Sequence, residues 1–342
     1  QRPRRTVIMT KRYLGNIITQ NPTAPAGPYE GDAAPGVWSL AEAFAYSKAG
    51  LWPTAGNALI LGIYAGGLSG WATDIQSITI PTLGNSSDFG DLFVGVSNQP
   101  AAASSSTRYL YAGGFDGSSN TNTIQYGDYN GGTGSDFGNL TSGRNGVAGL
   151  SNSTRAVFGG GSTNIMDYVT ISSLGDATDF GDLTKTTTSA RGVASTTRGV
   201  FMGDSSSGTI SYITIASTGN ATDFGDMSDN VKYFQGGACS NNTRGIYAGG
   251  SNSSSFGINN IEYITIASTG NSTDFGDLLS ADRYNDGVSS STRAVFLGFN
   301  GTDQSEYVTI ATTGNAAEFG DLTGSRSQVG SGTSNGHGGL AA

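Results

Sequence analysis

Cysteine and histidine are almost absent from this chain of 342 residues, which has one of each, Cys239 and His337. A single cysteine excludes a disulfide within the chain, and one cysteine with one histidine cannot build the Cys/His clusters of structural zinc sites. A histidine-based catalytic triad would have to use His337, which lies among glycines in the closing segment. We therefore expect no catalytic site, no metal site and no cofactor.

Long apolar runs and an excess of positive charge are also missing. The longest near-apolar run, ALILGIYAGGL from Ala58, is too short for a membrane-spanning helix. Only 13% of residues are charged, and the net charge of −9 argues against a general nucleic-acid binder. We expect no signal peptide, no membrane insertion and no nucleic-acid partner.

Glycine, serine, threonine and asparagine fill the sequence instead. Glycine alone occurs 54 times, whereas proline occurs 8 times. Disorder is a poor interpretation, because 36% of residues are hydrophobic and they form regular short runs. Short strands joined by Gly-rich and Asn-rich turns agree better with this pattern.

One stretch, ITIASTGNATDFGD (213–226), returns with small changes along the chain. Its Asp-Phe-Gly element, once Glu-Phe-Gly, marks six copies with a period of about 45 residues. The first residues of these elements are Asp88, Asp136, Asp179, Asp223, Asp274 and Glu318. A period of this length accommodates four short strands with their turns, which is one blade of a β-propeller.

The third copy shows the parts of the unit. Small residues at 146–151 suit a crowded inner strand, and an apolar strand at 156–161 runs into glycines. The next segment, 165–172, alternates apolar and polar residues, and 176–183 brings in the phenylalanine. A Thr-Arg pair precedes the second strand of five copies, at Arg108, Arg155, Arg198, Arg244 and Arg293.

These elements resemble kelch repeats, in which an apolar strand ending in Gly-Gly is followed by strands carrying Tyr and a large aromatic residue. The matching glycine elements are YAGG (64–67), YAGG (111–114), FGGG (158–161) and YAGG (247–250). Here Phe stands where kelch blades usually have Trp, and two copies lose the double glycine. The resemblance implies kelch-like architecture.

The two ends of the repeat array complement each other. The first copy starts at Asn57 with its second strand, and a surplus segment at 325–339 resembles an inner strand. Pairing the two closes a ring and hides sheet edges. We therefore predict an all-β fold, a six-bladed kelch-like propeller at 57–342 that a C-terminal strand closes.

The first 56 residues differ in composition from the repeats. They begin with basic and apolar residues and continue rich in Pro, Ala and Gly, so we expect an extended attachment arm. One short helix is predicted at 39–50, with Ser39 and Glu42 as a capping box. The predicted docking residues of this arm are Arg2, Arg4, Arg5, Lys11, Arg12 and Trp38.

The repeated polar residues have structural and functional interpretations. The Asp-Phe-Gly element is not a kinase motif, because it recurs and lacks the accompanying lysine and catalytic-loop motifs. Acidic pairs such as Asp223 with Asp226 could bind calcium, but turn hydrogen bonds explain them as well. The repeated arginines could form a basic ring on one face, or pack across the neighbouring blade and bond to carbonyl groups.

The segment GVWSLAEAFAYSKAGLWP (36–53) and the repeats resemble predicted structural proteins of tailed phages, notably those of marine cyanobacteria. The resemblance implies a virion protein, a tail-fibre, spike or surface-appendage component for host attachment. Because virion parts usually assemble with closed symmetry, we expect a homo-oligomer. The extended basic and apolar arm suits docking, so we expect residues 1–56 to join other virion proteins. The alternatives are a capsid decoration or cement protein and a bacterial secreted adhesion module. An enzyme is less favoured.

Recognition is expected where the repeats vary. In a four-stranded blade, the connections between strands two and three share a face with the crossings to the next blade, and these are the variable segments. Aromatic residues beside basic groups there suit a host-surface glycan or a partner protein. The candidate residues are Lys232, Tyr233, Phe234, Phe256, Arg283 and Tyr284. Alternatively, Tyr233 and Tyr284 only cover the junctions between blades.

Overall fold

The computed structural model describes residues 60–66, 73–203, 208–228, 235–252, 254–299, 301–325 and 330–340. These residues belong to one compact unit that starts at Ile60, and they form strands and no helix. No helix long and apolar enough to cross a membrane is found among them. The predicted arm, its helix at 39–50 and its docking residues lie outside the described part of the chain.

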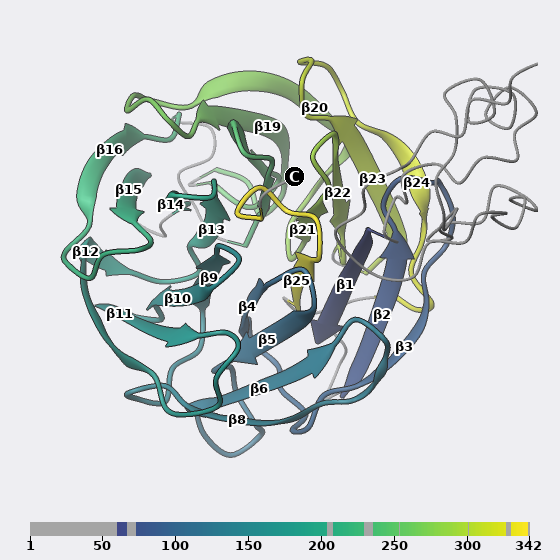
Figure 1. The fold of residues 1–342 in the computed structure, drawn as a ribbon. Coiled ribbons are helices and arrows are strands. Elements are labelled where there is room, and N and C mark those ends of the chain that lie inside the picture. Colours follow the sequence, from purple (N-terminus) through teal and green to yellow (C-terminus); the bar gives the residue numbers. More distant parts are fainter. Residues whose placement is uncertain are drawn as a thin grey trace, which may run out of the picture. The chain divides into compact units, whose positions relative to one another are not determined.

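Six sheets are arranged in a ring, one for each copy of the repeat (Figure 1). From the centre outward, blade 1 has β25 (Gly330–Ser334), β1 (Leu61–Gly66), β2 (Asp74–Thr79), β3 (Ser87–Asp91) and the short β7 (Gly132–Thr133). Blade 2 has β4 (Ala101–Ser104), β5 (Arg108–Ala112), β6 (Thr123–Asp128) and β8 (Ser135–Asn139). Blade 3 has β9 (Val147–Ser151), β10 (Arg155–Gly160), β11 (Thr163–Thr170) and β12 (Thr178–Thr187).

The other three blades repeat this order. Blade 4 has β13 (Arg191–Ala194), β14 (Arg198–Met202), β15 (Thr209–Thr214) and β16 (Thr222–Asp226). Blade 5 has β17 (Gly237–Ser240), β18 (Arg244–Ala248), β19 (Ile258–Thr265) and β20 (Thr273–Asp282). Blade 6 has β21 (Asp286–Ser289), β22 (Arg293–Leu297), β23 (Gln304–Thr309) and β24 (Ala317–Asp321).

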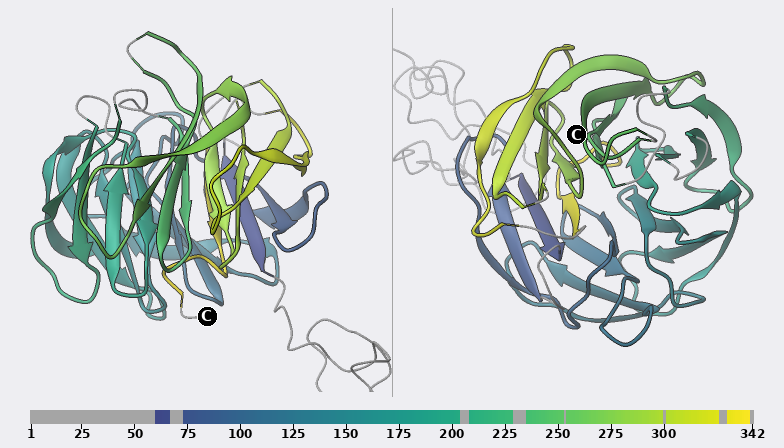
Figure 2. Two further views of the ribbon diagram at one scale, coloured as in Figure 1. Left: turned by 90° about the horizontal axis from the view of Figure 1, so that it is seen from above. Right: turned by 180° about the vertical axis from the view of Figure 1, so that it is seen from behind.

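The predicted closure of the ring is confirmed. The C-terminal strand β25 pairs antiparallel with β1, in a register that runs from Gly62 opposite Ser334 to Gly66 opposite Gly330. Strands from the two ends of the repeat array therefore share one sheet, and the described residues after β25 lie at one face of the ring (Figure 2). Closure leaves the inner edge of blade 1 paired rather than exposed.

The hydrophobic core lies between neighbouring blades. One cluster joins Leu110 and Phe137 of blade 2 to Val147 and Phe158 of blade 3, all of them buried. Another joins Val200 of blade 4 to residues of blade 5 in the same way. Because each blade buries its apolar faces against the next, the blades stabilise one another.

The repeated arginines bond to the next blade. Each donates from one terminal nitrogen to an isoleucine carbonyl there, as Arg155 does to Ile215 at 2.9 Å. Its guanidinium also lies over a tyrosine of its own blade, 4.3 Å from the ring centre of Tyr168 for Arg155. That tyrosine packs edge-on against the Asp-Phe-Gly phenylalanine, Phe180 in this blade. The structural interpretation of these arginines is therefore confirmed.

The Gly-Asn pair of the repeat links blades at their outer strands. The amide of Gly219 in blade 4 donates to the Phe180 carbonyl of blade 3 at 2.7 Å. The next residue, Asn220, accepts from the Asp182 amide at 3.0 Å. Equivalent bonds join blades 2 and 3, where Asp176 replaces the asparagine, and also blades 4 and 5, 5 and 6, and 6 and 1. Between blades 1 and 2, the short β7 pairs with β3 instead. In these five pairs of blades, the repeated stretch therefore binds the Asp-Phe-Gly element of the preceding blade.

Candidate binding face

Antiparallel order in each blade sends successive connections to opposite faces of the ring. In blade 3, residues 152–154 and 171–177 lie on one face, here called the uniform face. Residues 161–162 and the crossing 188–190 lie on the other, here called the variable face. The sequence varies most in the connections of the variable face, since the turns before the second strands of blades 2 to 6 all resemble SSTR.

Small residues line the central channel because the inner strands approach one another closely. A Cβ atom on Gly149 would meet the backbone of Ala102, and one on Gly192 would meet the backbone of Gly149. The equivalent positions in the six inner strands are Ala102, Gly149, Gly192, Ala238, Gly287 and Gly332. The narrow space around the channel axis thus explains why the inner strands of the repeat consist of small residues.

Serine hydroxyls bond the inner strands together near the uniform face. Ser151 donates to the Ser104 carbonyl at 2.8 Å, and Ser289 donates to the Ser240 carbonyl at 2.8 Å. The same bond recurs from Ser104 to Ser334, from Ser334 to Ser289 and from Ser240 to Ala194. Ala194 interrupts the series, since it has no hydroxyl to offer the Ser151 carbonyl.

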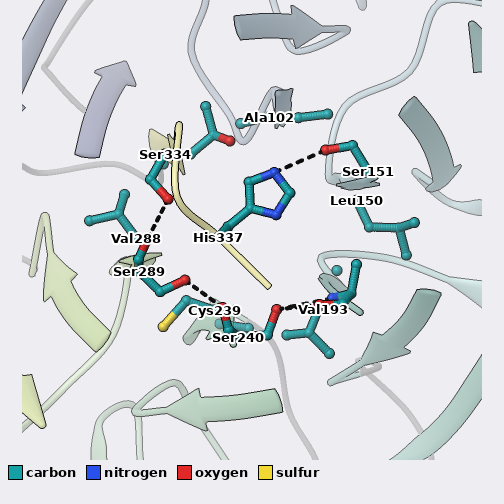
Figure 3. Close-up of a pocket in the computed structure, with 18 residues that line it drawn as sticks. Ala102, Leu150, Ser151, Val193, Cys239, Ser240, Val288, Ser289, Ser334 and His337 are labelled. Carbon is teal, nitrogen blue, oxygen red and sulfur yellow. Dashed lines mark hydrogen bonds between the residues drawn. The ribbon is translucent and has the colours of Figure 1, made fainter. Parts of the chain in front are cut away.

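The C-terminal segment fills the position that Ala194 leaves open. Gly339 lies so close to the Ser151 carbonyl that no Cβ would fit, and the Gly338 amide donates to the Ser240 carbonyl at 2.8 Å. The ring of His337 projects toward the inner strands (Figure 3), with Nε2 3.1 Å from the Ser104 carbonyl oxygen. The chain end therefore closes the channel at the uniform face.

His337 and Ser151 are in contact, but they are not arranged as a base and a nucleophile. His337 Nδ1 accepts from the Gly339 amide at 3.1 Å, so the proton resides on Nε2 and is directed at the Ser104 carbonyl. Nε2 is 3.3 Å from the Ser151 hydroxyl, which itself donates to a carbonyl group. Burial lowers the pKa of His337 to about 4, which keeps the ring neutral near pH 7.

A cavity of about 50 Å³ remains in the channel, bordered by inner-strand residues and His337. This volume holds a few water molecules and is far smaller than the pockets that enclose small-molecule ligands. The channel is therefore too small for a ligand larger than a few water molecules, and such a ligand has to bind outside it.

At the variable-face end of the channel, buried charges are paired with each other. Arg191 and Asp286 form an ion pair at 3.5 Å and both are buried. Arg191 also donates to the Gly236 carbonyl at 2.7 Å, and Asp286 accepts from the Gly332 amide at 3.1 Å. These bonds offset the cost of burying the charges and join the inner strands of several blades.

Five crossings of the variable face share an unusual backbone conformation. Each of them reaches its inner strand through a residue with positive φ, a region that side chains with Cβ rarely adopt. The φ values are 60° at Gln99, 64° at Gly146, 62° at Ser189, 77° at Gln235 and 70° at Tyr284. The Tyr284 amide donates to the Gln235 carbonyl at 2.7 Å, so these two neighbouring corners are bonded to each other.

Three of the six residues predicted for recognition come together on this face. Phe256, on the connection between β18 and β19, is 81% exposed. The Arg283 guanidinium carbon lies 5.1 Å from the ring centre of Phe256 and 4.4 Å from that of Tyr284. The other three predicted residues, Lys232, Tyr233 and Phe234, lie outside the described part of the chain. We call Phe256, Arg283 and Tyr284 the aromatic-arginine cluster.

Arg283 differs from the five repeated arginines in its hydrogen bonding. All five stack on a tyrosine and donate to an isoleucine carbonyl of the next blade. The Arg283 guanidinium stacks on aromatic rings too, yet it has no hydrogen-bond acceptor or ion-pair partner among the described residues. Its N–H groups are therefore available to a ligand.

Buried acids elsewhere have structural partners. Third strands carry a buried polar residue just before the repeated tyrosine, and it bonds to the blade before it. Asp167 accepts from the Thr141 hydroxyl at 2.7 Å, and Glu306 accepts from the Leu279 amide at 2.8 Å. Burial raises the pKa of Glu306. Within the described ranges, no three His, Cys, Asp or Glu side chains are grouped to hold a metal.

Sequence patterns did not reveal the positive-φ corners or the role of Ala194. The one available signal for the corners was the recurrent position of Gln99, Ser189, Gln235 and Tyr284 five residues before the end of each inner strand. For Ala194, the signal was the alanine at a position where five inner strands end in serine.

No family model and no curated protein matches this chain.

Proposed function

We propose that this chain is a virion structural protein of a tailed phage and forms part of a tail fibre, spike or other surface appendage. Residues 1–56 would attach it to other virion proteins. The variable face of the propeller would be presented to a host surface or to a partner. Support for the virion assignment comes from the resemblance of residues 36–53 and of the repeats to phage structural proteins.

One structural observation favours a binding function for the variable face. The channel and the repeated arginines, tyrosines and Gly-Asn pairs are occupied by contacts within the ring. The aromatic-arginine cluster stands outside these contacts, on connections that differ between copies. Aromatic residues and arginine are enriched in interface hot spots, and Arg283 has no acceptor among the described residues.

The location of the protein on particles tests this proposal. Antibodies raised against residues 60–340 would be used to label particles purified from the virus that encodes the chain, followed by electron microscopy. Label on tail fibres or spikes supports the proposed function. Label spread over the capsid supports decoration instead, and particles without label overturn a virion role.

The attachment role of the arm is tested in assembly. A variant lacking residues 1–56 should fold, because the described strands all lie after this segment, but should no longer be incorporated into particles. Circular dichroism checks the fold, and immunoblots of purified particles measure incorporation. Normal incorporation of the truncated chain would show that the anchor lies elsewhere.

A further inference from the structure

The guanidinium of Arg283, which has no acceptor in the described part of the chain, is held in a defined orientation. Stacking against Phe256 and Tyr284 covers parts of its faces, at 5.1 and 4.4 Å from the two ring centres. A stacked guanidinium keeps its N–H groups around the edge of its plane, where they can form bonds. Arg283 therefore presents a planar group of N–H donors whose orientation its neighbours fix. These donors have no acceptor among the described residues.

The backbone on both sides of the cluster is also fixed. Tyr284 has a φ of 70°, which is strained for a bulky aromatic residue, and its amide bonds to the Gln235 carbonyl. On the other side, the Asn252 side chain accepts from the amides of Ser254 and Ser255 at 2.9 and 2.8 Å. The cluster is therefore organised before any ligand arrives.

The shape and charge of this group select a class of ligand. The planar fork of a guanidinium matches the two oxygens of a carboxylate or a phosphate, and such charge-assisted pairs are stronger than neutral hydrogen bonds. Phe256, at 81% exposure, adds a flat apolar surface against which a sugar ring can pack. The chain has a net charge of −9, so anions are attracted locally at Arg283 rather than by the whole protein.

We propose that Phe256, Arg283 and Tyr284 form a binding site for an oxyanion, a carboxylate or a phosphate, on an acidic surface polysaccharide. Arg283 donates to the anionic oxygens, and Phe256 packs against the adjoining sugar ring. Tyr284 holds the guanidinium in place. This inference rests on the proposed function, because attachment to a host surface is what brings a polysaccharide to the variable face.

Binding of defined polymers to the full chain tests the site. The probes are polygalacturonate, its methyl ester and a phosphorylated mannan, measured by biolayer interferometry at two salt concentrations. Polygalacturonate or the phosphorylated mannan should bind, and the one that binds more tightly identifies the oxyanion. The methyl ester should bind at least about tenfold more weakly than polygalacturonate if the carboxylate is the recognised group.

Matched variants separate the site from general charge. Arg283→Gln should weaken binding about tenfold, and Arg283→Lys by a smaller factor because the charge remains without the fork. Lys185→Gln removes an equal charge from an exposed position on β12 of blade 3 and should change binding less than about twofold. Phe256→Ala should weaken binding several-fold, and thermal melting curves would check that every variant folds.

Three results would overturn the oxyanion site. They are failure of the wild-type chain to bind either acidic polymer, equal binding of wild type and Arg283→Gln, and an equal loss in Lys185→Gln. Particle labelling reports on the proposed function separately. Labelled appendages with unaffected binding in Arg283→Gln would refute the site alone, whereas Arg283-dependent binding by a chain absent from particles would refute the virion function alone.

Discussion

Arginine has two roles in this propeller, a link between blades and a candidate binding group. They differ in whether the guanidinium has a hydrogen-bond acceptor within the described residues. Arg244 stacks on Tyr263 and donates to the Ile310 carbonyl at 2.9 Å, so it joins blade 5 to blade 6. Arg283 stacks in a similar way but has no acceptor in the described structure. The same side chain is thus a structural link in one position and a candidate binding group in the other.

His337 should make stability depend on pH between its ordinary and its folded-state pKa. Burial lowers the pKa of His337 from 6.5 to about 4, so the unfolded chain binds a proton in this range and the folded chain does not. Its contribution is therefore present above pH 6.5 and is lost as pH falls to about 4. Its size is about 2 kcal/mol, because the side chain is only half-buried and solvent screens part of the effect.

Urea unfolding of wild type and His337→Gln, measured from pH 7 to pH 4, would isolate this contribution. The difference in unfolding free energy between the two proteins should shrink as pH falls, because glutamine does not titrate. A difference that stays constant over this range would contradict the buried neutral histidine.

At the scale of single elements, the fourth strand and the turn of the next blade form one unit. The Gly314 amide donates to the Phe275 carbonyl at 2.8 Å, and Asn315 accepts from the Asp277 amide at 3.1 Å. These bonds require the two backbones to approach closely at Gly276. The strand-turn contact therefore explains why the Asp-Phe-Gly element has a glycine at this position.

Gly276→Ala should destabilise the protein by roughly 2–4 kcal/mol. The added Cβ would lie 2.5 Å from the Gly314 carbonyl group, and the φ of 148° is unfavourable for alanine. Chemical denaturation followed by far-ultraviolet circular dichroism measures the loss. Gly324→Ala is the matched control, because no atom lies within 4 Å of its added Cβ. Equal stability of the two variants would show that this contact contributes little.

For the molecule as a whole, closure depends on one five-residue strand. β25 is the inner strand of blade 1, and it also contacts the neighbouring inner strands, with Ser334 bonding to Ser289 and Ser104 bonding to Ser334. The residues after it fill the channel at the uniform face. The last residues of the repeat array therefore stabilise its first blade.

Deletion of residues 325–342 should lower the melting temperature by about 10 °C or more, because blade 1 loses its inner strand and the channel loses its closing segment. Differential scanning calorimetry measures the change. Deletion of residues 341–342 alone keeps β25 and should leave the melting temperature nearly unaltered. An unchanged melting curve for the longer deletion would refute closure through this strand.

Repetition in the sequence determined the architecture. The Asp-Phe-Gly period set the number of blades, the alternation around Tyr168 identified a third strand, and the surplus at 325–339 predicted the closing strand. These features follow from sequence because strand pattern and turn chemistry depend on residues close together in the chain, and because six copies repeat the same signal.

Tertiary structure alone decided how individual residues of the candidate site are used. The sequence predicted that Phe256, Arg283 and Tyr284 lie on one face. It did not predict that Arg283 stacks on both rings and lacks an acceptor among the described residues. The sequence also did not predict that the segment after β25 fills the gap beside Ala194. Such contacts join residues far apart in the chain, and they depend on side-chain orientations and blade spacing that only the closed ring fixes.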